Sequence, residues 1–273
     1  ALLARHAAGK AASPQLAAES SRAVAPAAST PMAQNVFSAG TYDEVPLDGM
    51  RSTIAQRLQA SKQTVPHFYL SIDVELDAVL ALRQQLNAGA HRDAQDVPAY
   101  KLTLNDFVMR ALALALQRVP QANAAWAGDR ILRFHRCDVG VAVAVDGGLY
   151  TPVIRGAEAK TLSAISNEIR ALSHKARQRS LRSGDCQGGA TSVANLGMHG
   201  IKEFAAIINP PQSTMLAVGE AGERVVAKGG APAVVQAMTV TLSCDHRVVD
   251  GALGAQLLQA FKALMQQPMN LLV

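Results

Sequence analysis

The stretch SCDHRVVDG, residues 243–251, places a thiol, an imidazole and two carboxylates within nine positions. Three kinds of chemistry could use such a set. Cys244 and His246 could act as a nucleophile and its base. His246 could instead remove a proton from a substrate's own nucleophile. The groups could also contribute to a metal site, although no His/Cys cluster with metal-ligand spacing accompanies them. The non-catalytic alternative is a polar corner where a strand meets a helix.

The elements on either side determine how this stretch is held. Before it, Met238–Cys244 alternates polar and apolar residues as a strand does, and Cys244 falls on the apolar side. A buried, unreactive thiol is therefore favoured over a catalytic one. After it, apolar residues recur at helical spacing from Gly251, and Asp250 stands where a helix N-cap belongs. His246 is thus predicted on a strand-to-helix loop, a common place for a catalytic side chain.

Hydrophobic periodicity along the remaining chain predicts an α/β domain, a mixed sheet with helices packed on it. Helices are expected over residues 49–62, 76–86, 104–119, 161–179 and 251–265. Strands are expected over residues 68–75 and 139–145, around 191, around 207, and over 214–218, 223–228 and 233–242. The last two strands are joined by a pair of glycines, which indicates a hairpin.

Composition narrows the class of protein. Hydrophobic residues make up 49% of the 273 positions and aromatic residues only 4%, so the core must be aliphatic. The apolar runs are shorter than the ~20 residues that span a bilayer, which predicts no membrane segment. The net charge of +5 permits an anionic partner, but the Lys and Arg residues are scattered and predict no nucleic-acid partner. Three widely separated cysteines, Cys137, Cys186 and Cys244, suit a reducing compartment.

The first 41 residues differ from the rest. They are rich in Ala, Ser and Pro and show no sustained period, which favours an interdomain linker. A targeting presequence is the alternative, because the segment also carries Arg and Ser and few acidic residues. The predicted division is a linker over residues 1–41 and a folded domain over residues 42–273.

The DHRVVDG motif and the helix after it resemble the C-terminal signature of the 2-oxo acid dehydrogenase acyltransferases, His-x-x-x-Asp-Gly, which chloramphenicol acetyltransferase shares. Three further blocks resemble that family in the right order: residues 50–77, 139–154 and 195–220. The amino-acid sequences of these blocks are most similar to those of the acetyl-transferring members that work with pyruvate dehydrogenase. The resemblance covers residues 42–273 and implies a trimeric, chloramphenicol acetyltransferase-like two-layer α/β fold.

The resemblance also implies a mechanism. Coenzyme A and a dihydrolipoyl arm, carried on an upstream domain, would enter opposite ends of a channel between two subunits. His246 would take the proton from a thiol, whose thiolate then attacks the acetyl thioester. A thiol of pKa near 8.5 needs only modest help from an imidazole near 6.5. Asp250 would hold the site together by pairing with an arginine, for which Arg51 is the candidate. Asp245 and Arg247 are interpreted as structural.

One position departs from the family pattern. Where the family commonly has a serine that donates to the oxyanion, immediately before Asn-Leu-Gly, this chain has Ala194. Ser192 is the candidate replacement donor, with Thr191 as the alternative. A shift of two residues along a strand keeps the face but moves the group by ~6–7 Å. Intact His246 and Asp250 favour an active acetyltransferase; Ala194 favours a catalytically weak structural paralogue of the core. A free-standing small-molecule acetyltransferase is the third hypothesis.

Assembly is likewise implied by the resemblance. Trimers of this family join into cages of 24 or 60 subunits, and upstream domains bring the pyruvate dehydrogenase and dihydrolipoamide dehydrogenase components. The apolar segment Met269–Val273 is predicted to dock into a neighbouring trimer, the alternative being that it folds back on its own subunit. The mitochondrial matrix and the bacterial cytoplasm both fit such a protein.

Overall fold

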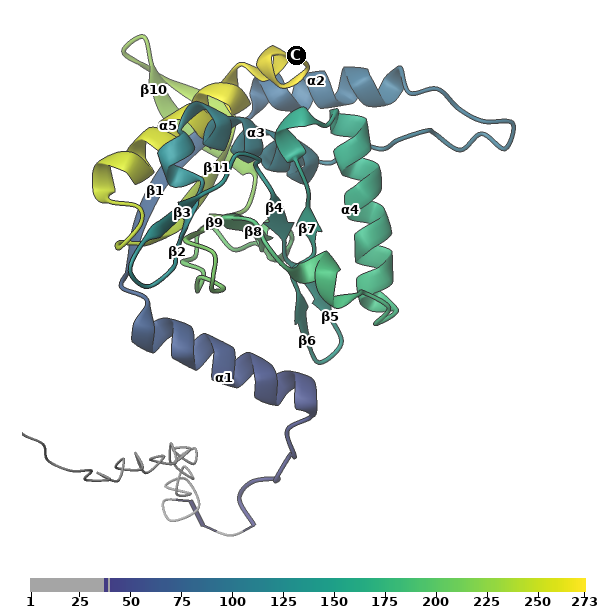
Figure 1. Cartoon of the computed structure of the whole chain (residues 1–273). Coiled ribbons are helices and arrows are strands. Elements are labelled where there is room, and N and C mark those ends of the chain that lie inside the picture. Colours follow the sequence, from purple (N-terminus) through teal and green to yellow (C-terminus); the bar gives the residue numbers. More distant parts are fainter. Residues whose placement is uncertain (1–36, 39) are drawn as a thin grey trace, which may run out of the picture. The chain divides into compact units, whose positions relative to one another are not determined.

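The computed structural model describes residues 37, 38 and 40–273 (Figure 1). The predicted linker over residues 1–41 lies almost entirely outside the described residues. The chain divides after Pro46, and the second unit, Leu47–Val273, contains the helices and strands discussed here. The first helix begins at Gly49, and the start of the folded domain at residue 42 stays a prediction.

A seven-stranded mixed sheet forms the centre of the second unit, in the order β1-β11-β9-β8-β4-β7, with β10 paired to β11. The pairs β4–β8 and β8–β9 are parallel, and the other pairs are antiparallel. Two ribbons, β2–β3 and β5–β6, stand apart from the sheet. The strands are β1 (His67–Glu75), β2 (Ala124–Trp126), β3 (Ile131–Arg133), β4 (Val139–Val141), β5 (Val143–Val145), β6 (Gly148–Tyr150), β7 (Val153–Ile154), β8 (Thr191–Asn195), β9 (Thr214–Val218), β10 (Gly222–Lys228) and β11 (Ala231–Asp245).

The helices that cover the sheet follow the predicted periods. They are α2 (Asp77–Ala88), α3 (Leu104–Arg118), α4 (Leu162–Arg177) and α5 (Gly251–Gln266). Helix α3 is buried over almost its whole length, as its nearly continuous apolar sequence predicts, and it packs against α5. Helix α5 in turn packs on β1 and β11, where a Cβ on Gly254 would meet the side chain of Leu70 at 2.8 Å. A residue larger than glycine at this position would require the Leu70 side chain to move.

The strand predicted around Ile207 is wrong. Residues 201–209 have no regular structure, and side chains rather than a neighbouring strand bind the backbone of Ala206 and Ile208. Ser243 donates to the Ala206 carbonyl at 2.6 Å, Ser61 donates to the Ile208 carbonyl at 2.6 Å, and the Ile208 N–H donates to His67 Nε2 at 3.1 Å. The two prolines that follow lack the N–H groups that a ladder needs. The segment therefore joins β1 and β11 to α1 (Gly49–Thr64) as an irregular layer.

Candidate active site

His246 lies one residue beyond β11 and five before α5 begins, on the loop that the sequence predicts. Its backbone N–H donates to the Pro66 carbonyl at 3.0 Å, which ties the loop to the start of β1. The imidazole packs against the ring of Phe68, with centroids 4.8 Å apart and planes 57° apart. The residue is nevertheless exposed in the single chain. An imidazole on a backbone that is held on both sides and open to solvent can exchange protons with an incoming molecule.

Asp245 organises the turn around this histidine. Its carboxylate, with a side chain only 3% exposed, accepts two bonds from the Arg247 guanidinium, at 2.9 Å from Nε and 2.8 Å from Nη2. It also accepts the Arg247 backbone N–H, and its carbonyl accepts the N–H groups of Val248 and Val249. The bond to Asp245 raises the pKa of Arg247 further above its usual value. The Arg247 side chain is 31% exposed, so the ion pair is only partly shielded from water, and the backbone bonds to Asp245 add further ties across the turn.

Asp250 caps helix α5, as predicted from its position. Its Oδ1 accepts the Leu253 N–H at 2.8 Å, and its own backbone is extended, as an N-cap requires. The predicted partner Arg51 is not brought to it. Among residues 47–273 no ion pair joins the two; the Arg51 backbone N–H instead donates to Oδ1 of the N-cap residue Asp48 at 2.6 Å. An Arg51–Asp250 pair would therefore have to form between subunits.

Cys244 is not available as a nucleophile. It is fully buried beneath α5, and burial, followed by the charge of Asp245, raises its thiol pKa to about 12. At neutral pH the thiol is therefore protonated, and only the thiolate attacks carbonyl carbon. The described residues also contain no group of three His, Cys, Asp or Glu side chains able to hold a metal ion. Of the chemistries open to the SCDHRVVDG stretch, proton removal from a substrate by His246 is the one that the geometry accommodates.

Ser192 has a different environment from the one its proposed role requires. It is fully buried on β8, and its hydroxyl donates to Gln212 Oε1 at 2.5 Å, while Gln212 Nε2 donates to the Gly188 carbonyl at 3.2 Å. The alternative donor Thr191 is also fully buried, and its Oγ1 has no partner among the described residues. Ala194, on the same side of β8 as Ser192, is half-buried.

Strand register separates these β8 positions from the histidine. Ala194 pairs with Ala217, which pairs with Thr241 on β11, five residues before His246. Residue 194 and His246 are therefore separated by two strand spacings across the sheet and five residues along β11, a Cα–Cα distance of roughly 19 Å. Ser192 pairs with Met215, which pairs with Ser243, three residues before His246. The Cα–Cα distance from Ser192 to His246 is therefore roughly 14 Å. Neither β8 residue can share a reacting atom with the His246 of its own chain.

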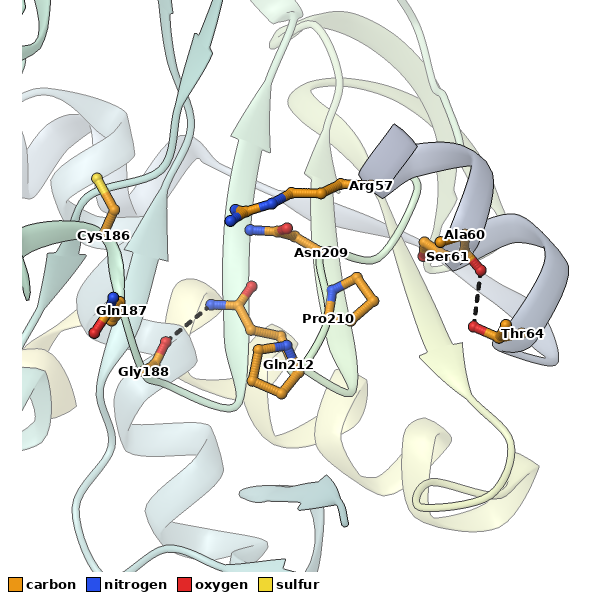
Figure 2. Close-up of a pocket in the computed structure, with 11 residues that line it drawn as sticks. Arg57, Ala60, Ser61, Thr64, Cys186, Gln187, Gly188, Asn209, Pro210 and Gln212 are labelled. Atoms are coloured by element: carbon orange, nitrogen blue, oxygen red, sulfur yellow. Dashed lines mark hydrogen bonds between the residues drawn. The ribbon is translucent and has the colours of Figure 1, made fainter. Parts of the chain in front are cut away.

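A cleft of about 620 Å³ opens between α1 and the loops that precede β8 and β9 (Figure 2). In Figure 2, Arg57 extends from α1 toward Asn209, and the Gln212 amide points toward Gly188. No carboxylate in the described part of the chain pairs with Arg57. The cleft can therefore admit a molecule with an anionic group. Its lining residues are Arg57, Ala60, Ser61, Thr64, Cys186, Gln187, Gly188, Asn209, Pro210, Pro211 and Gln212.

Two residues that line the cleft are close in sequence to residues that hydrogen-bond to the histidine loop. Gln212 precedes Ser213, whose carbonyl accepts the Asp245 N–H at 2.8 Å. Thr64 is two residues before Pro66, which holds His246. Sequence reasoning missed Arg57 and Gln212, because they line one cleft only when α1 and the 201–212 segment are folded together. No local signal distinguishes Arg57, because the same helix also carries the cations Arg51 and Lys62.

The chain was compared with known proteins. Residues 39–273 match the family model of the 2-oxoacid dehydrogenases acyltransferase (catalytic domain). The chain is 54% identical over 239 residues to the dihydrolipoyllysine-residue acetyltransferase component of the pyruvate dehydrogenase complex of Rhizobium meliloti, covering 87% of this chain and 53% of that protein. Similar relatives include both bacterial and mitochondrial proteins. This chain spans about half the length of the curated relatives it matches.

Two solved structures have the same fold. The cubic core of the pyruvate dehydrogenase multienzyme complex is 28% identical, with a TM-score of 0.79 over 86% of this chain and 96% of that one. A dihydrolipoamide acetyltransferase of Azotobacter vinelandii is 27% identical, with a TM-score of 0.78 over 86% of this chain and 95% of that one. The latter structure was studied for the roles of a serine, a histidine and an asparagine in catalysis. The chain belongs to the acyltransferase family of the 2-oxoacid dehydrogenases, and the predicted mixed α/β fold is confirmed.

No helix of the described residues is long and apolar enough to cross a membrane.

Proposed function

We propose that this chain is an acetyltransferase core that moves an acetyl group between a dihydrolipoyl arm and coenzyme A, with His246 as the general base. The observation that carries the proposal is an exposed imidazole, on a loop held by backbone hydrogen bonds, beside a cysteine that is too deeply buried to act. The nucleophile must then come from the substrate. Both proposed substrates have a thiol, and family membership supports this pairing.

The reaction balances without a protein nucleophile. His246 accepts the proton of the attacking thiol, and the thiolate adds to the carbonyl carbon of the acetyl thioester. The tetrahedral oxyanion then collapses, the original carbon–sulfur bond breaks, and the leaving thiolate receives the proton from the imidazolium. An imidazole can perform both transfers because its neutral and protonated forms are both accessible near neutral pH.

Two subunits would share each site. In the Azotobacter relative, the catalytically studied serine precedes the histidine by 52 positions and the asparagine follows it by four. In this chain Ala194 and Asp250 have the same spacings from His246. Because residue 194 lies roughly 19 Å from His246 within one chain, we assign the two positions of one site to different subunits. The cleft beside Arg57 is the candidate entrance for coenzyme A, whose phosphates suit an unpaired guanidinium.

The test is an assay of acetyl transfer from acetyl-CoA to dihydrolipoamide, with succinyl-CoA as the competing acyl donor. Transfer of acetyl groups, at a kcat/KM at least about tenfold above that for succinyl groups, is the expected result. A preference for succinyl-CoA would overturn the substrate assignment. No transfer from either donor would favour the second candidate, a structural paralogue, for which the replacement of the family serine by Ala194 is the supporting observation.

Similarity to a cubic multienzyme core supports a cage built from trimers for this chain too. The segment Met269–Val273 contains both a buried side chain and exposed apolar side chains, which narrows the docking prediction to the exposed ones. Leu271 is 1% exposed in its own core and its carbonyl accepts from Arg110 Nε, whereas Met269, Leu272 and Val273 are exposed. We propose that these exposed side chains dock on a neighbouring trimer. A cage of 24 or 60 subunits, together with the dehydrogenase components, would follow in a bacterial cytoplasm or a mitochondrial matrix.

The double variant Met269→Ser, Leu272→Ser should produce particles of trimer mass that keep their transferase activity. The apolar contacts that join trimers are removed, while Leu271 and the Arg110 contacts are retained. Analytical ultracentrifugation measures the outcome. Val97→Ser, at another exposed apolar residue, is the matched control and should leave full-size cages. Full-size cages from the double variant would show that the segment has no role in joining trimers.

A further inference from the structure

A closed ring of contacts lies beneath the histidine loop and includes residues that the proposed reaction does not use. Arg247, which is bonded to Asp245, places its guanidinium carbon 5.2 Å from the centre of the Trp126 ring, in cation–π geometry. Trp126 ends β2, in a small ribbon outside the main sheet. The tryptophan therefore reaches the loop from an element about 120 residues earlier in the chain.

The ring is closed by one serine. The Ser213 hydroxyl donates to the Ala124 carbonyl of β2, and the Ser213 carbonyl accepts the Asp245 N–H at 2.8 Å. Ser213 is fully buried, so both bonds are shielded from water. The path Asp245, Ser213, Ala124, Trp126, Arg247 and back to Asp245 thus joins the end of β11 to the ribbon by four different kinds of contact: a ladder-edge bond, a hydroxyl bond, a ring stack and an ion pair.

The ring encloses the residue that carries the chemistry. His246 stands between Asp245 and Arg247, and its own backbone N–H is held from the other side by Pro66. The imidazole of His246 makes none of the contacts in this closed path and lies against Phe68 instead. A displacement of a reacting group by about 1 Å can cost a hundredfold in rate. Backbone fixation on both sides is therefore expected to matter for kcat.

We infer that Trp126, Arg247 and Asp245 form a clamp that positions the His246 imidazole for proton transfer, so that the β2–β3 ribbon is part of the catalytic apparatus without touching the substrate. The inference depends on the proposed function for its kinetic consequence, but not for its effect on the loop. These three are positioning residues, since they act through His246. The clamp should affect the rate of the reaction more than the affinity for either substrate.

The test uses Trp126→Leu, Arg247→Lys and the conservative Trp126→Phe in the assembled protein. Trp126→Leu removes the aromatic face, while the backbone bonds of the ribbon remain; Arg247→Lys keeps the charge but loses the two-pronged bond to Asp245. Both should lower kcat by about 10- to 100-fold, with KM for each substrate changed by less than about twofold. Trp126→Phe should restore most of the loss. Arg224→Lys is the control, because Arg224 forms an ion pair with the exposed Asp73, and this variant should keep full kcat.

Two measurements do not depend on activity. Hydrogen exchange of the amides of residues 246–249 should accelerate in the Leu and Lys variants while the α3 amides stay protected. Trp126 is the sole tryptophan of the sequence, so its fluorescence reports the stack directly and should become easier to quench in Arg247→Lys. Unchanged exchange at residues 246–249 would overturn the clamp even if the protein transfers no acetyl groups. A fall in kcat that Trp126→Phe does not relieve, with exchange raised equally in α3, would show general destabilisation and also overturn it.

Discussion

Replacement of His246 by alanine is expected to lower kcat for acetyl transfer by about 10²–10⁴-fold, the usual contribution of a positioned general base. The residue is exposed, and the fold around it is held by its backbone N–H and by Asp245 rather than by its ring. The substitution should therefore leave the cage and its thermal stability close to those of the parent. Steady-state kinetics with both thiol substrates, at matched particle size, measures the effect.

His91→Ala is the matched control, because His91 is another exposed loop histidine, and its backbone carbonyl accepts the Ala99 N–H whatever the side chain. Its kcat should equal that of the parent. Higher pH should partly rescue His246→Ala, since the substrate thiol, of ordinary pKa near 8.5, ionises without help as pH rises. A variant that retains the parent rate at pH 7 would exclude His246 as the base and would leave only a shared fold with the acyltransferases.

The local parts of the site could be predicted from the sequence. The alternation before Cys244 predicts its burial, and Asp250 is recognisable as an N-cap because a cap depends only on the next three residues. Both features arise from contacts within a few positions along the chain. The same holds for β1, where Phe68, Leu70 and Ile72 are half-buried, Val74 is buried, and the residues between them are exposed. The strand–loop–helix frame of His246 therefore follows from local sequence patterns alone.

The non-local parts could not be predicted. The error around Ile207 arose because that segment is apolar enough for a strand, yet Ser243, Ser61 and His67 bind its backbone in place of a neighbouring strand. The contact between Trp126 and Arg247 depends on where a short ribbon folds back, which no local pattern records. Likewise, the separation of residue 194 from His246 follows from the register of three strands and not from either motif.

Introduction of a serine at position 194 is expected to raise kcat by up to about 10²-fold, because loss of one oxyanion donor typically costs about 10²–10³. Ala194 is half-buried on β8, so a hydroxyl fits without opening the strand and should change the free energy of unfolding by no more than about 0.5 kcal/mol. The gain should appear in kcat with KM nearly constant, since the oxyanion exists only in the transition state and the intermediate that follows it.

The Ala194→Ser result also separates the two proposals for the chain. If the parent is a weak paralogue, the added donor should convert it into a clearly active enzyme, and the gain should disappear in a His246→Ala background. Ala227→Ser, on the exposed strand β10, controls for a new surface hydroxyl. An unchanged kcat in Ala194→Ser would show that another group already binds the oxyanion. Because Ser192 is bonded to Gln212, that group would have to be a backbone N–H or a side chain of the neighbouring subunit.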